Sequence, residues 1–193
     1  MKPIDAAQAR DHLEMVQRIL EESQPRLCSG GEYFVVWGIA SAYATVCSAL
    51  IAQGAAPPGM VWSIFAVLAA AGIFSGVRAR LTRRILQRSS LIQREFFNVL
   101  WLALGLAFIT NIAVYRIFSG MASAAVWSVA EAIILLYIGM HGNRRAQVAG
   151  VLVVVSLVVA NFAPAPITAY VLGAGMLFGY GGFGLSELLA RDE

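Results

Sequence analysis

Residues 121–140 read MASAAVWSVAEAIILLYIGM, an almost wholly apolar stretch of 20 residues. It contains a single charged residue, Glu131, close to its centre. An α-helix rises about 1.5 Å per residue, so about 20 residues cross a hydrocarbon core about 30 Å thick. The stretch therefore predicts a membrane-spanning helix with a carboxyl group near the middle of the bilayer.

Similar stretches occur along the whole chain, of which 59% is hydrophobic and only 13% charged. Soluble domains are nearer a quarter charged. Helices are the expected spanning elements, because lipid cannot satisfy the backbone groups of open strands. The sequence predicts an all-α, polytopic integral membrane protein whose six spans form three antiparallel hairpins. These spans are 33–53, 59–77, 96–117, 121–140, 146–162 and 167–189.

The basic residues predict how the protein is oriented. The chain has 14 Lys and Arg, and 13 of them fall on one side of the predicted spans. Basic loops are typical of the cytoplasmic face, so we expect both termini in the cytoplasm and the six spans in the inner membrane. Nucleic-acid binding is not expected, because these residues flank spans and form no separate basic domain.

The polar segment 1–31 precedes the predicted transmembrane domain, 32–193. Helical spacing places Leu13, Val16 and Leu20 on one stripe of a predicted amphipathic helix. This helix could lie against the protein's own cytoplasmic loops, or it could contact a cytoplasmic protein or a second copy. Two heptads are marginal as a coiled coil on their own.

The second predicted loop is rich in arginine and includes Arg83, Arg84 and Arg88. Its first interpretation is a determinant of topology, and its second is a binding surface for anionic lipid or an acidic partner. Glu32 and Glu187 lie near the same membrane edge. Glu32 begins a span, where the helix dipole favours an acid, and pairing with the arginine loop is the alternative for both.

Glu131 is the residue most suggestive of chemistry. A charged carboxylate at the bilayer centre costs about 2.5–3.5 kcal/mol on insertion scales, so it should face the bundle interior or a wet cavity. A tight turn near Gly120 would bring Asn111 within about one helical turn of it, and Ser128 lies one turn away on the same helix. The three side chains are predicted to form a proton, cation or ligand site. The alternative is a neutral acid that only joins two helices.

The sixth span is rich in glycine, including Gly179, Gly181, Gly182 and Gly184. One GxxxG motif ends at Gly179, and another, at Gly72 and Gly76, lies in the second span. Small residues allow helices to approach closely, so tight packing is expected. The alternative for 179–184 is a flexible or unwound segment that lines a binding site.

No motif for catalysis, metal binding or a cofactor stands out, so we expect neither an enzyme nor a bound cofactor or metal. Cys28 and Cys47 lack CxxC spacing, and His12 and His141 lie in separate segments. The favoured function is a small-solute or ion binding or permeation component. The alternative is a membrane-embedded regulatory or scaffold protein that engages a cytoplasmic partner through the N-terminal helix and the arginine-rich loop.

Overall fold

The protein is helical throughout the residues that the structure describes. A computed structural model describes residues 30–83, 91–113 and 121–190, without the side chains of 82–83, 91–97, 111–113, 121 and 166. The predicted N-terminal helix therefore lies outside the described residues. The elements are α2 (Gly31–Ala52), the short 3-10 helix η1 (Pro58–Met60), α3 (Val61–Arg83), α4 (Leu91–Ala113), α5 (Met121–Met140), α6 (Arg144–Phe162), α7 (Ala165–Gly175), the π-helix η2 (Met176–Gly181) and α8 (Gly182–Leu189).

Five described segments are long and apolar enough to cross a membrane: Gly31–Ala52, Pro58–Leu81, Ala122–Met140, Arg144–Phe162 and Ile167–Leu189. The last combines most of α7 with η2 and α8. In α4, whose side chains are described only for 98–110, the whole of that part, Asn98–Thr110, is apolar. The all-helical, membrane-compatible character is thus confirmed for the residues that the structure describes. The count of six spans and the hairpin arrangement stay predictions.

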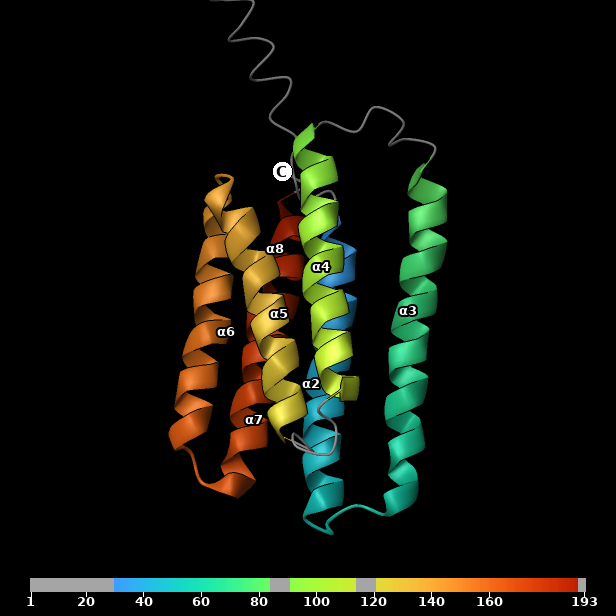
Figure 1. The fold of residues 1–193 in the computed structure, drawn as a ribbon, viewed down its shortest axis with the longest axis vertical. Coiled ribbons are helices and arrows are strands. Elements are labelled where there is room, and N and C mark those ends of the chain that lie inside the picture. Colours follow the sequence, from blue (N-terminus) through green and yellow to red (C-terminus); the bar gives the residue numbers. More distant parts are fainter. Residues whose placement is uncertain (1–29, 84–90, 114–120, 191–193) are drawn as a thin grey trace, which may run out of the picture.

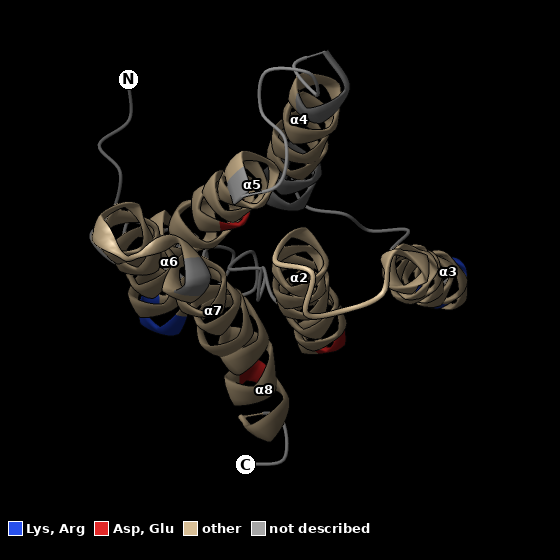
Figure 2. Ribbon diagram, turned by 90° about the horizontal axis from the view of Figure 1, so that it is seen from below, with Lys and Arg blue, Asp and Glu red and all other residues tan. Residues whose placement is uncertain are grey.

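The helices lie side by side along one direction (Figure 1). Seen along the bundle, α2 lies between α3 on one side and α7 with α8 on the other (Figure 2). Helix α5 packs against α4 and α6, and α6 also packs against α7. Among the described residues, α3 contacts only α2 and η1, so it forms one edge of the bundle.

Two turns between helices depend on glycine. Gly54 follows α2 with φ 70°, and Gly142 follows α5 with φ 95°. Side chains other than glycine rarely adopt this left-handed region, which is typical of residues that follow a helix. After Gly142, the Asn143 side chain accepts a hydrogen bond from the backbone N–H of Ala146 (3.1 Å) and caps the start of α6. The chain therefore reverses direction in very few residues.

The core of the bundle is made by α5, α6, α2 and the last span. Ile134, Leu135 and Ile138 of α5 are fully buried, and they pack with Val153 of α6 and Phe183 of α8. Many large apolar side chains on the outside remain exposed, such as Trp62, Trp101 and Phe162. Such a surface would be costly in water but suits a surrounding of lipid chains.

Candidate functional site

Glu131 lies in the interior of the bundle, ten residues after the start of α5. Its side chain is only 4% exposed. The hydroxyl of Ser41, near the middle of α2, donates a hydrogen bond of 2.7 Å to Glu131 Oε1. This bond joins two helices that are separated by 90 residues in the sequence.

The second carboxyl oxygen, Glu131 Oε2, is buried and has no hydrogen-bond partner. A buried polar atom without a partner costs about 1–3 kcal/mol, and more if it is charged. The ion pair found among the described residues joins Arg78 to Glu32 and does not involve Glu131. The carboxyl group is therefore held at one oxygen and left unsatisfied at the other.

An aromatic cluster closes the neighbouring space between α2 and the last span. The ring of Phe34 lies 4.9 Å from the ring of Tyr180 and 4.9 Å from that of Phe183, measured between centroids. All three side chains are buried. Tyr180 is also within electrostatic range of Glu131. The site is thus formed by α2, α5 and the π-helix η2, with apolar rings on one flank.

The π-helix η2 determines which residues of the last span face the site. Met176, Gly179, Tyr180 and Gly181 of this segment are buried. A π-turn accommodates one residue more than an α-turn and occurs often at functional sites. Thr45 of α2 donates a hydrogen bond to the sulfur of Met176 (3.3 Å), which ties the start of η2 to the first span.

Close glycine contacts hold η2 and α8 against α2. A Cβ atom at Gly184 would lie 2.5 Å from the carbonyl oxygen of Gly31 and 2.6 Å from the backbone nitrogen of Val35. A Cβ atom at Gly38 would collide with the backbone of Gly181. These backbones are therefore in direct contact, and a larger side chain would separate α2 from the last span.

Glycine also allows η2 to approach α6 closely, because a Cβ atom at Gly179 would lie 2.5 Å from Val153 Cγ2 in α6. Gly182 differs, since no atom lies within 4 Å of its would-be Cβ. The same holds for Gly72 and Gly76 of α3, so the GxxxG of the second span makes no close contact with any described residue. The segment 179–184 is helical, in the π form as far as Gly181 and in the α form after it.

Ser128 and Asn111 are the other two residues that were predicted to form a site with Glu131. Ser128 is fully buried, but its hydroxyl donates a hydrogen bond to the carbonyl oxygen of Ala124 in its own helix (3.0 Å). Asn111 lies in α4, and its side chain is outside the described part of the chain. The proposed cluster of Asn111, Ser128 and Glu131 therefore stays a prediction.

The predicted partner and lipid contacts lie almost wholly beyond the described residues. This applies to Leu13, Val16, Leu20, Arg84 and Arg88, and to the side chain of Arg83 at the end of α3.

Sequence reasoning missed Ser41 as the partner of Glu131. The signal available was a hydroxyl near the middle of another span, at a depth similar to that of Glu131. Reasoning from the nearest turn favoured α4, because consecutive spans usually pack together. In the structure α2 and α5 pack together although two helices, α3 and α4, lie between them in the sequence.

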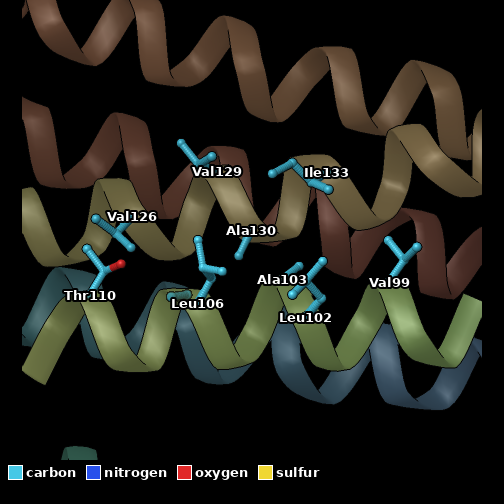
Figure 3. Close-up of a pocket in the computed structure, with 10 residues that line it drawn as sticks. Val99, Leu102, Ala103, Leu106, Thr110, Val126, Val129, Ala130 and Ile133 are labelled. Carbon is cyan, nitrogen blue, oxygen red and sulfur yellow. The ribbon is translucent and has the colours of Figure 1, made fainter.

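A second feature is an apolar groove of about 380 Å³ between α4 and α5 (Figure 3). Its walls are two facing rows of aliphatic side chains, which include Leu102 and Leu106 on α4 and Val129 and Ile133 on α5. Thr110 supplies a hydroxyl at one end. Ala130, the neighbour of Glu131, lines the groove, whereas Glu131 does not.

Polar contacts gather at the end of the bundle where α2 begins and α3 ends. Arg78 donates two hydrogen bonds of 2.8 Å to the carboxylate of Glu32. Asn143 donates one of 3.0 Å to Glu187, and Arg145 donates one of 3.0 Å to the carbonyl oxygen of Ser186. These bonds link α2 to α3 and α6 to α8 at one edge of the predicted membrane region.

Comparison with known proteins gives no match. No family model matches the chain, and neither the curated proteins nor the solved structures contain a significant match. Among the described residues, no group of three or more His, Cys, Asp or Glu side chains could hold a metal ion.

Proposed function

We propose that this chain is a multi-pass inner-membrane protein that binds a small solute or an ion through the carboxyl group of Glu131. The observation that carries the proposal is the buried, unpartnered oxygen Oε2 of that residue. Ionisable residues inside membrane spans are costly and usually mark ion or substrate paths. A purely structural role would be served equally well by a neutral amide or hydroxyl, which carries no risk of a buried charge.

The position of Glu131 supports the same function. It joins α2 and α5 through Ser41 and lies beside the π-helix, so three spans meet at one ionisable group. Sites of this kind in membrane transporters lie near the bilayer midplane, where irregular helices meet. A ligand that changes the charge or the bonding of Glu131 would therefore act on all three elements.

The proposal includes six crossings with both termini in the cytoplasm. Its support is the distribution of charge along the helices. Apart from Glu131, the charged side chains that the structure describes belong to the end where α2 and α6 begin and α3 and α8 end: Glu32, Arg78, Arg80, Arg144, Arg145 and Glu187. Basic residues favour the cytoplasmic side, so we assign this end to the cytoplasm.

The test uses dicyclohexylcarbodiimide, an apolar reagent that modifies protonated carboxyl groups within membranes. Purified protein in lipid nanodiscs is treated with the reagent, and the modified residue is identified by mass spectrometry. The probes are NaCl, KCl, tetraphenylphosphonium and a series of pH values. We expect modification at Glu131, slowed at least fivefold by one of these probes.

The matched control is Glu187→Gln, which makes the same chemical change at the polar end of the bundle. It should leave the modification unchanged, whereas Glu131→Gln should abolish it. A rate at Glu131 that no probe alters, or the absence of modification there, would reject the proposed function.

A further inference from the structure

We propose that the ligand of Glu131 is a proton, which is held on Oε2 and exchanges with the surroundings; this inference rests on the proposed function. The two oxygens of the carboxyl group have different surroundings. Oε1 accepts a hydrogen bond from Ser41, whereas the buried Oε2 accepts none. In a neutral acid the carbonyl oxygen accepts hydrogen bonds and the hydroxyl oxygen carries the proton, so Oε1 suits the first role and Oε2 the second.

An ionised carboxylate is poorly supported at this position. It offers about four acceptor sites, and one donor, Ser41, is provided. Burial of a carboxylate without a cation or further donors costs several kcal/mol. A bound proton removes the cost of the buried charge and leaves only the smaller cost of an unpaired hydroxyl.

The other buried hydroxyl groups of α2, α5 and α6 donate to partners other than Glu131. Alkali and alkaline-earth cations need several oxygen ligands that converge on one point. Here Thr45 donates to the sulfur of Met176, Ser128 to the carbonyl oxygen of Ala124, and Ser156 to that of Val153. These hydroxyls are directed to partners of their own rather than to Glu131.

Larger solutes would have to separate helices that are in contact. Phe34, Tyr180 and Phe183 fill the flank of the site, and the Gly38 and Gly181 backbones touch next to them. The apolar groove between α4 and α5 lies beyond Ala130 and does not include Glu131. A proton needs none of this volume.

Two further groups bear on the exchange of this proton. Tyr180 of η2 is a buried titratable side chain of the last span that lies within electrostatic range of Glu131. In α4, residues 98–110 include no titratable side chain, and the charged residues of α2 and α6 lie at the polar end. Ser41 is only partly buried, so its hydroxyl connects the carboxyl group to the accessible flank of α2.

The test is infrared difference spectroscopy of the intact protein in nanodiscs across a pH series. We expect a carboxylic-acid C=O band at low pH that disappears reversibly at high pH. The band should be absent in Glu131→Gln and retained in Glu187→Gln. Replacement of KCl by NaCl or choline chloride at constant ionic strength should leave the titration unchanged.

Ser41→Ala tests whether Oε1 is the carbonyl oxygen that accepts the hydrogen bond from Ser41. Loss of the hydrogen bond to the carbonyl oxygen Oε1 should move the Glu131 C=O band to higher frequency. Thermal unfolding of the variant shows whether it is folded. The control is Ser63→Ala, which removes the hydrogen bond between Ser63 and Tyr43 of α2 and should not move the band.

Two results would overturn the inference. If Na⁺ or K⁺ displaces the band at constant pH, the ligand is a metal cation, and the proposed function stands while the proton does not. If the band of Glu131 does not change over the pH range in which the protein stays folded, the group exchanges no proton. Carbodiimide modification that is slowed by tetraphenylphosphonium would then still support the proposed function.

Discussion

At the scale of single residues, the described packing of the last span depends on the absence of side chains. Gly184 faces backbone atoms of Gly31 and Val35, which cannot move aside as a flexible side chain could. Gly182, two residues earlier, faces open space. Both belong to α8, so they form a matched pair that separates steric contact from helix propensity.

We expect Gly184→Ala to lower the free energy of unfolding by about 1–3 kcal/mol, the range for overpacked sites. Gly182→Ala should be neutral or stabilising by up to about 1 kcal/mol, because alanine favours the helix. Equilibrium unfolding of both variants in mixed micelles, followed by circular dichroism, measures the difference. Equal effects of the two substitutions would show that α2 and α8 are not in the contact described.

At the scale of elements, η2 interrupts an otherwise α-helical span. Tyr180 of this segment is buried within electrostatic range of Glu131, while Gly175 and Gly179 face α6. A π-turn arises where one residue is added to an α-helix, so the helix on either side keeps its orientation. Removal of one residue from η2 should restore the α-helix without rotating the flanking segments.

Deletion of Phe178, which is 66% exposed, is therefore expected to cost less than about 3 kcal/mol, as common point substitutions do. Deletion of Tyr170 in α7, also exposed, would turn one part of the helix against the other by about 100°. That variant should fail to fold. Detergent-solubilised yield and thermal unfolding provide the comparison, and equal loss in both deletions would argue against the π-helix.

Helix identity was predictable from the sequence, and helix partners were not. The predicted span 121–140 coincides with α5, because apolar composition and length determine it. The last predicted span, 167–189, contains a π-segment that composition does not reveal, although its glycines suggested an irregular stretch. Ser41 was missed because the choice of contacting helices depends on three-dimensional packing, which periodicity along one helix does not encode.

At the scale of the whole molecule, the distribution of burial distinguishes a central from a peripheral part. In the last span, 56% of the apolar stretch is buried inside the bundle. In the segment Pro58–Leu81, which includes α3, the buried share is 11%. Helix α3 is joined to α2 by polar bonds, from Trp37 to Ser75 and from Tyr43 to Ser63, with the Arg78–Glu32 ion pair at the end. The outer helices thus present apolar faces to lipid, and the ionisable site lies behind them.

The orientation of the bundle in the membrane can be tested by labelling of introduced cysteines. Cys28 and Cys47 are first replaced by alanine. Single cysteines are then introduced at Gly59, in the uncharged connection before α3, and at His141, at the polar end of the bundle. In right-side-out membrane vesicles, a membrane-impermeant maleimide should label position 59 and spare position 141, because basic residues retain their end in the cytoplasm. Detergent should then expose position 141.

A third cysteine, at Ser119, tests the number of crossings. If α4 spans the bilayer, position 119 should be labelled from the same side as position 59, which gives six crossings. Labelling of 119 only after detergent treatment would show that α4 does not cross. Labelling of 141 in intact vesicles in which position 59 is protected would reverse the orientation. The second result would place the arginine-rich end outside, and the assignment of both termini to the cytoplasm would fail with it.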